Sequence, residues 1–388
     1  MTKQTILSIP DFALVIVLAD EKADARQLIQ KMDGISVVST ENTSYDALKA
    51  AVYAHLTEGR SAILHHTNSA ENTRRSLYKW ARSAGAASVV IRVGTDTEQI
   101  SPSEPYGQLF ILPRDQISSA VIERTRMSVD LRHLKGPFDI VGDLHGCLEE
   151  LKELLVKLGY ATWYPNGIFR ITPHPDGRRL CFLGDLTDRG PKNLSTLQLV
   201  HHLHTSINAI TVLGNHDHKL MRWLRGRNVR QAAGLQMTVA EFEAEKVSAE
   251  YRADLAEWLE SLSTHHVLDE GRLIIAHAGL AERFHGRESA EAEAFALYGE
   301  KSGQSDTDGY PLTRDWAADY RGNATIVHGH VVTSEPRHLN KVVSIDTGCV
   351  FGGALTAYRY PENEYVSVPA RAEYFKYQKR QPATDPTE

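Results

Sequence analysis

From Ala13 to Leu112, short apolar runs alternate with stretches whose apolar residues lie three or four positions apart. Runs of this length predict buried strands, and the wider spacing predicts amphipathic helices. Because strands that alternate with helices form parallel sheets covered on both faces, this region is predicted to be an α/β domain. The predicted strands are Ala13–Leu18, Val37–Ser39, Ser61–Leu64 and Ala87–Val93, and the predicted helices are Ala23–Met32, Tyr45–Leu56 and Asn72–Ala81.

The pattern changes after this region. Thr97–Gln108 is polar and contains serine and proline, which predicts a loop. Gln116–Arg132 has the charged, spaced pattern of a surface helix and leads to Lys135, Gly136 and Pro137. We therefore expect a domain boundary near Gly136.

The length fits this division, because 388 residues predict two or three domains at roughly 150 residues each. We expect a first domain over residues 1–135 and a second over residues 136–370. Residues 371–388 are expected to form a polar, disordered tail.

Composition excludes several classes of protein. The net charge of −6 gives no general basic surface for nucleic acid, so any such contact must be local. Three cysteines without a Cys-x-x-Cys pair argue against a disulfide framework and for a reducing compartment. No apolar stretch is long enough for a signal peptide or a membrane span, so we expect a cytoplasmic protein without membrane contact.

The second region also alternates strands, loops and helices. Thr238–Leu262 is predicted to be an inserted amphipathic helical stretch, and the turn-rich Gly299–Pro311 a surface loop. Ligands of open α/β sheets bind beyond the carboxyl ends of the strands, which makes these ends the best places to look for a site. The predicted strand ends are Val141, Leu183, Leu213, Ala276 and Val327.

Polar, glycine-flanked residues follow each of these strand ends. Each has an ordinary alternative: Asp143 could cap a helix, Asp188 and Arg189 could form a surface pair, and a lone histidine is usually packed in a core. Their occurrence at five successive strand ends favours one shared metal site. The candidate ligands are Asp143, His145, Asp185, Asn215, His277 and His330.

The types of ligand indicate the metal. Carboxylate, amide and imidazole groups without a thiolate suit manganese, iron, nickel or zinc. Six protein ligands are too many for one catalytic ion with open positions, so we predict two divalent ions, with manganese as the first choice. One carboxylate must then bridge the ions, and Asp185 is the candidate.

The motifs GDLHG, GDLTDRG, GNHD, HAG and HGH together resemble those of the calcineurin-like metallophosphoesterases, in particular the phosphoprotein-phosphatase branch. From about Phe138 to Pro369 the amino-acid sequence is similar to the phosphatase module of bacterial polynucleotide kinase-phosphatases, for example in FLGDLTDRGP and GNHDHKLMRWLRGRNV. The resemblance implies a double β-sheet sandwich flanked by helices, with a dinuclear site at one edge. It also implies that Asp143, His145 and Asp185 hold one ion, and that Asp185, Asn215, His277 and His330 hold the other.

Three further residues are expected to act on the substrate. Arg189 would bind the phosphoryl oxygens through its planar fork. His216 lies beside a ligand without being one, and would give a proton to the leaving oxygen, while Asp188 would hold its other ring nitrogen. A water activated by the metal ions is then the nucleophile.

The first domain is compared with the P-loop kinase domain of the same polynucleotide kinase-phosphatases. Its first apolar strand is similar, but Asp20, Glu21 and Asp24 stand where a glycine-rich phosphate loop would be. His65, with the residues at 66–68, resembles a kinase segment that has lost its acidic residue. We expect a degenerate kinase-like domain without kinase activity, retained for packing, substrate positioning or partner binding.

The sequence thus predicts a metal-dependent phosphatase that hydrolyses phosphomonoesters. The resemblance alone implies the expected substrate, which is 2′- or 3′-phosphate or 2′,3′-cyclic phosphate ends of RNA. A protein Ser/Thr phosphatase and a dinucleoside tetraphosphatase are the alternatives, and a non-catalytic RNA-repair or signalling adaptor is the alternative of another class. Basic residues after the third motif would either bind a polynucleotide or form a solvated helix face: Arg222, Arg225, Arg227 and Arg230.

Overall fold

The structure is a computed structural model that describes residues 5–39, 45–65, 71–94, 100, 104, 106–232, 234–305 and 311–376. It divides into two compact units, which we describe separately. The first comprises Met1–Ser128 and Gly286–Ala292, and the second comprises Val129–His285 and Glu293–Glu388. Within the described ranges, every helix is too short or too polar to cross a bilayer.

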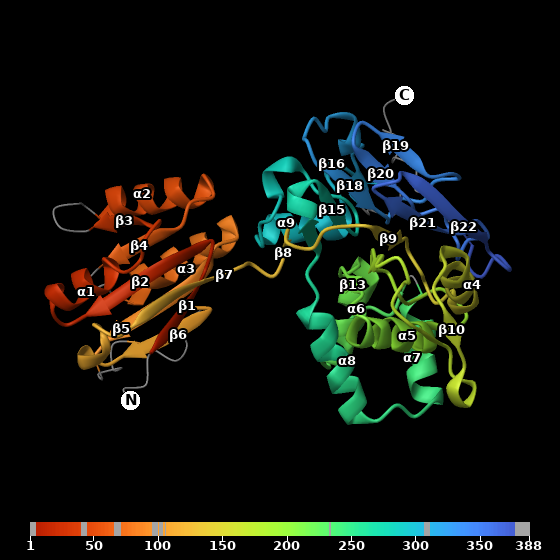
Figure 1. Cartoon of the computed structure of the whole chain (residues 1–388), viewed down its shortest axis with the longest axis horizontal. Coiled ribbons are helices and arrows are strands. Elements are labelled where there is room, and N and C mark those ends of the chain that lie inside the picture. The colour runs from red at the N-terminus through yellow and green to blue at the C-terminus, as the bar shows by residue number, and fades with distance from the viewer. Residues whose placement is uncertain are drawn as a thin grey trace. The chain divides into compact units, whose positions relative to one another are not determined.

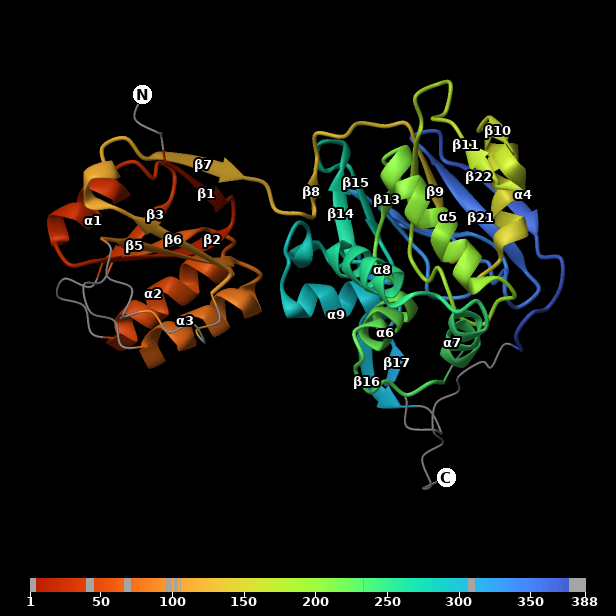
Figure 2. The ribbon, with the colours of Figure 1, turned by 90° about the horizontal axis from the view of Figure 1, so that it is seen from below.

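The first unit is built on a parallel sheet of five strands. The strands are β2 (Ala13–Ala19), β3 (Ser36–Ser39), β4 (Ala62–His65), β5 (Ala87–Val93) and β6 (Gln108–Leu112), and the helices are α1 (Lys22–Ile29), α2 (Tyr45–Thr57) and α3 (Glu71–Ala84). The strand order is β3-β4-β2-β5-β6. Leu14 and Ile16 of β2 pack with α2 and α3, whereas Val15 and Val17 pack with α1 on the other face (Figure 2). The predicted α/β class is confirmed.

The predicted charged helix over Gln116–Arg132 is wrong. A short 3-10 turn at Arg114–Gln116 precedes β7 (Val121–Thr125), which pairs in parallel with β1 (Ile6–Pro10). β7 is polar and largely exposed, so it lacks the apolar run that marks a buried strand. Its partner strand lies at the start of the unit, and a local pattern cannot reveal such a pairing.

The second unit contains two sheets packed face to face (Figure 1). One has the order β13-β12-β9-β21-β22 and the other the order β19-β20-β18-β15-β14-β8. Between them lies an apolar layer that includes Ile140 and Leu183 from one side and Ile275 and Val327 from the other. The predicted double sandwich is confirmed. The strands are β8 (Asp130–Leu131), β9 (Phe138–Val141), β12 (Arg179–Phe182), β13 (Ile210–Thr211), β14 (His265–Leu268), β15 (Leu273–Ala276), β18 (Thr325–His328), β19 (Arg337–Leu339), β20 (Val342–Ser344), β21 (Ala354–Tyr360) and β22 (Glu364–Pro369).

Helices cover the outer face of the five-stranded sheet, where Leu151, Leu197 and Leu255 belong to the same apolar cluster as Phe182. The predicted helical stretch over Thr238–Leu262 is two helices, because the chain turns between them. The helices of this unit are α4 (Leu148–Leu158), α5 (Asn193–Ser206), α6 (Asn215–Leu224), α7 (Leu235–Ala244), α8 (Ala249–Ser261) and, from Glu293 onward, α9 (Ala290–Tyr298).

Two segments are more ordered than the sequence predicts. Part of the expected loop Gly299–Pro311 pairs as an antiparallel hairpin of β16 (Lys301–Ser305) and β17 (Pro311–Thr313). In the predicted tail, the hydroxyl of Tyr374 donates to Glu150 Oε1 at 2.8 Å and its N–H donates to Val350 O at 3.0 Å. Residues 371–376 are therefore attached to the second unit, and residues 377–388 lie outside the described ranges.

A second antiparallel hairpin joins β10 (Thr162–Trp163) to β11 (Arg170–Ile171).

The layer between the sheets gives a stability prediction. Ile275 is fully buried there, so Ile275→Ala should lower the free energy of unfolding by about 2–5 kcal/mol. Val156 on α4 is 54% exposed, and Val156→Ala should change stability by no more than about 0.5 kcal/mol. Scanning calorimetry of the transition of the second unit would measure both. Equal effects would contradict the assignment of this layer as the core.

Candidate metal centre

The loops that follow the strands of both sheets meet at one place in the second unit. β9, β12 and β13 are parallel neighbours, so their carboxyl ends share one edge, and β15 and β18 are likewise parallel. Backbone hydrogen bonds tie the loops together: the N–H of His145 donates to Asp185 O at 2.8 Å, and that of Gly329 donates to His277 O at 2.8 Å. The five strand ends singled out in the sequence are thereby brought together.

Several predicted site residues have a left-handed backbone. A positive φ is uncommon for a residue other than glycine and costs about 1–3 kcal/mol when the surrounding structure imposes it. Such strain is concentrated at functional sites, because there the fold must hold side chains in one orientation. The φ values are 40° at His145, 48° at Asp185, 75° at Asp188, 69° at Arg189 and 67° at His330.

Two groups of possible metal ligands share Asp185. His145, Asp185 and His216 form one group, and Asp185, His277 and His330 form the other, with the ligand atoms of each group within 4.8 Å of one another. The two oxygens of Asp185 point to different groups. Oδ2 lies 3.5 Å from Nε2 of His145, and Oδ1 lies 3.4 Å from Nε2 of His277. This is the arrangement that a bridging carboxylate requires.

Hydrogen bonds on the far side of the rings fix which nitrogen faces inward. Nδ1 of His145 lies 2.8 Å from Thr187 O, and Nδ1 of His277 lies 2.9 Å from Leu183 O. A carbonyl oxygen only accepts, so both Nδ1 atoms carry the proton and both Nε2 atoms present a lone pair to the centre. Metal-binding histidines are oriented by bonds of this kind.

The second group brings acceptor atoms into contact. Nε2 of His277 lies 3.0 Å from Oδ1 of Asn215 and 3.1 Å from Nδ1 of His330. Neither Nε2 nor the amide oxygen has a proton to give, so their contact is unfavourable unless a cation lies between them. The donor set therefore fits a divalent ion.

Asp143 belongs to neither group of three, but it lies beside them. Its carboxylate accepts the N–H of His330 at 3.1 and 3.2 Å. Burial raises the pKa of Asp143 well above its ordinary value, and the charges of Asp346 and Asp185 raise it further. A bound cation would offset this repulsion and stabilise the charged form of the buried carboxylates.

Asp346 is a residue that the sequence analysis missed. It is buried, and burial raises its pKa to about 6. It comes just after β20, so the rule that gave the candidate ligands would have included it if Val342–Ser344 had been recognised as a strand.

The three predicted catalytic residues contact one another. Nδ1 of His216 lies 2.6 Å from Oδ2 of Asp188, and because the carboxylate only accepts, Nδ1 is the donor. Arg189 donates from Nη2 to Nε2 of His216 at 2.8 Å and from Nη1 to Nε2 of His145 at 2.6 Å. Burial lowers the pKa of His216 and raises that of Asp188 to about 6, so at neutral pH the imidazole is neutral and the carboxylate is charged.

Two supporting residues were not assigned from the sequence. Thr238 donates from its hydroxyl to Oδ1 of Asp188 at 2.6 Å, which fixes the carboxylate that orients His216. Asp217 accepts the N–H groups of Leu186 and Gly214 at 2.9 and 3.0 Å and thus joins the second and third loops. Asp217 stood in a motif, but no local signal distinguished a loop-joining carboxylate from a ligand.

The chain is similar to several known proteins. Residues 136–334 match the family described as calcineurin-like phosphoesterase. A bis(5′-nucleosyl)-tetraphosphatase PrpE (asymmetrical) of Geobacillus sp. is 48% identical over 238 residues, which are 61% of this chain and 95% of that protein. The protein of the same name from Halalkalibacterium halodurans is 48% identical over 236 residues, 60% of this chain and 94% of its own. A solved protein serine/threonine phosphatase of Saccharomyces cerevisiae has 17% identity and a TM-score of 0.41, with 66% of this chain and 86% of that chain covered.

Proposed function

The chain belongs to the calcineurin-like phosphoesterase family and is a metal-dependent phosphoric ester hydrolase, and from this premise we propose that it cleaves the phosphate chain of dinucleoside polyphosphates. The geometric support for the reaction class is the pair of ligand groups that share Asp185. The support for the substrate is the 48% identity over 95% of a relative named as a dinucleoside tetraphosphatase. This substrate was one of the alternatives that the sequence left open.

We propose that two divalent ions, manganese in the first place and otherwise nickel, iron or zinc, are held by the six ligands expected from the sequence. Asp143, His145 and Asp185 would hold one ion, and Asp185, Asn215, His277 and His330 the other. When bound, such a pair lowers the pKa of a shared water toward ~7 and offsets negative charge on the phosphoryl group.

The residues around this pair have separate tasks. Arg189 lies between the imidazoles of His145 and His216, where its two terminal nitrogens can turn to two phosphoryl oxygens. Nε2 of His216 is the ring atom that faces this space, and it would pass a proton to the leaving oxygen. Asp188 keeps the ring in the required tautomer and stabilises its protonated form.

Phosphorylated RNA ends are the second candidate. They are supported by the similarity of the motifs, and of the sequence between them, to the phosphatase module of polynucleotide kinase-phosphatases. Both candidates need the same metal centre and differ in what lies beyond the attacked phosphorus: further phosphates in one case and a ribose in the other.

For the first unit we propose a role without kinase activity, in substrate positioning or partner binding. At the carboxyl end of β2, Asp20 forms ion pairs with Arg92 at 2.5 Å and with Arg114 at 3.6 Å, and Asp24 pairs with Arg114 at 3.0 Å. These internal pairs stand where a kinase would need amides and a lysine to hold phosphate. The resemblance noted for residues 66–68 lies outside the described ranges.

A substrate panel tests the proposal. With manganese, kcat/KM for diadenosine tetraphosphate should exceed that for 3′-phosphorylated RNA, 2′,3′-cyclic phosphate RNA and a phosphopeptide by at least about tenfold, or roughly 1.4 kcal/mol in transition-state binding. Removal of metal with a chelator should abolish all activities, and added manganese should restore them. A higher kcat/KM for either RNA would favour the second candidate, and no activity on any member would favour the adaptor alternative.

A further inference from the structure

Helix α6 presents basic residues on the same face as a proposed metal ligand. The helix begins at Asn215, and His218, Lys219 and Arg222 follow it at positions i+3, i+4 and i+7. Residues with this spacing lie on one side of a helix. The opposite side faces the core through Asp217 and Leu220, which are fully buried.

The spacing gives the basic residues a fixed reach from the metal centre. Arg222 lies seven positions after Asn215 in the helix, which is a rise of roughly 10 Å. Lys219 and Arg222 are three positions apart, so their Cβ atoms lie about 5–6 Å from each other. Two cations thus follow one another along a line that starts at the metal centre.

Tyr298, the last residue of α9, packs against the same apolar cluster as Leu220 of α6. Burial raises the pKa of Tyr298, the charge of Arg222 lowers it, and that of Asp185 raises it. Tyr298 therefore lies within electrostatic reach of both the basic residue and the proposed bridging ligand. His218 likewise interacts with the charge of Arg222, in addition to the effect of its own burial.

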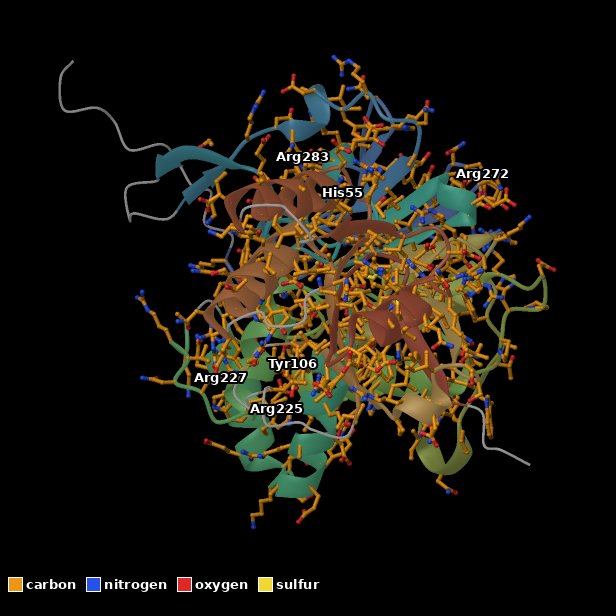
Figure 3. All side chains as sticks on the ribbon, turned by 90° about the vertical axis from the view of Figure 1, so that its left-hand side faces the viewer. His55, Tyr106, Arg225, Arg227, Arg272 and Arg283 are labelled. Atoms are coloured by element: carbon orange, nitrogen blue, oxygen red, sulfur yellow. The ribbon has the colours of Figure 1, made fainter. Side chains whose placement is uncertain are left out.

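The side chain of Arg222 makes no hydrogen bond or ion pair with any residue that the structure describes. Its neighbour Arg225, by contrast, is paired with Glu260, Nη2 to Oε2 at 2.6 Å. Figure 3 shows Arg225 together with Arg227 on the segment that ends and follows α6. Arg222 is partly buried and its guanidinium can bind an external anion. Arg225 instead links α6 to α8 through its ion pair with Glu260.

We propose that His218, Lys219 and Arg222, with Tyr298, form a second phosphate subsite, which binds the phosphates that remain on the leaving nucleotide of a polyphosphate substrate. The inference rests on the proposed function, because it names what holds the rest of that substrate. Two cations within one helical turn suit the closely spaced phosphates of a polyphosphate chain. The phosphates of RNA are separated by riboses, and the net charge of −6 provides no extended basic surface for them.

The test uses the full chain with manganese and 4-nitrophenyl phosphate as the reporter substrate. Inorganic tripolyphosphate should inhibit the wild type more tightly than orthophosphate does, with the free manganese concentration held constant. Arg222→Ala should raise the inhibition constant of tripolyphosphate by about tenfold or more, the loss expected for a charge-assisted contact. It should leave KM for 4-nitrophenyl phosphate and the inhibition constant of orthophosphate unchanged.

Arg225→Ala is the matched control, because it removes the same charge from a residue that is already paired. If both variants weaken tripolyphosphate equally, the effect is one of general charge and the subsite does not exist. Equal inhibition of the wild type by tripolyphosphate and orthophosphate would also overturn the inference. So would an Arg222→Ala variant whose only defect is a lower kcat/KM for 3′-phosphorylated RNA. Failure of the wild type to cleave diadenosine tetraphosphate would instead contradict the proposed function alone, since the inhibition assay does not depend on that cleavage.

Discussion

Asp185→Asn should lower kcat/KM on every substrate of the panel by at least about 10³-fold, the upper end of what loss of one preorganised electrostatic contact costs. The carboxylate is the single group common to both sets of ligand atoms, with one oxygen 3.5 Å from His145 Nε2 and the other 3.4 Å from His277 Nε2. An amide has one oxygen and no charge, so it can serve only one of the two directions. The variant should therefore also bind less metal, because both ions lose a ligand.

The measurement combines steady-state kinetics with the metal content of the purified variant. Asp176→Asn is a suitable control, because that side chain is 82% exposed and its loss should change neither quantity. Circular dichroism would show that the fold is retained. A variant that keeps two ions for each chain and full turnover would exclude a bridging role for Asp185.

The convergence of the candidate ligands could be predicted from sequence because it follows a topological rule. Parallel strands end at one edge, so polar residues after successive strands converge even when they are distant along the chain. The prediction needs only the strand ends, and an error of one or two residues does no harm: β12 ends at Phe182 and β13 at Thr211, slightly before the ends expected from the sequence. Asp346 was missed because β20 was not recognised.

Apart from the expected pair of His216 and Asp188, the contacts within the site could not be predicted in the same way. Nothing in a local pattern shows that Arg189 lies between two imidazoles, because this depends on a backbone held at φ 69° by loops from several strands. The pairing of β7 with β1 was missed for a related reason, since β7 is polar and exposed and its partner is more than 100 residues away, so no local periodicity signals their contact. The fold follows largely from local patterns, whereas side-chain orientation depends on long-range contacts.

His216→Ala should lower turnover by about 10²–10⁴-fold on substrates with a poor leaving group, while it spares 4-nitrophenyl phosphate. An alkoxide such as the ribose oxygen of a 3′-phosphate needs a proton as it departs, whereas nitrophenolate leaves without one. The phosphate leaving group of a dinucleoside polyphosphate is less basic than an alkoxide, so the loss on that substrate should be intermediate. The measurement is kcat across these three leaving groups.

The same series separates the two roles that the geometry allows for His216. It lies within 4.8 Å of the ligand atoms of His145 and Asp185, as a metal ligand would, but its Nδ1 is bound to Asp188 at 2.6 Å, as in a proton-transferring pair. If it transfers a proton, His216→Ala keeps its metal and the loss grows with the basicity of the leaving group. Asp188→Asn should then show the same trend, because the amide no longer fixes the tautomer. If His216 is a ligand, the loss is equal on all three leaving groups and the metal content falls, and the leaving oxygen must obtain its proton from elsewhere.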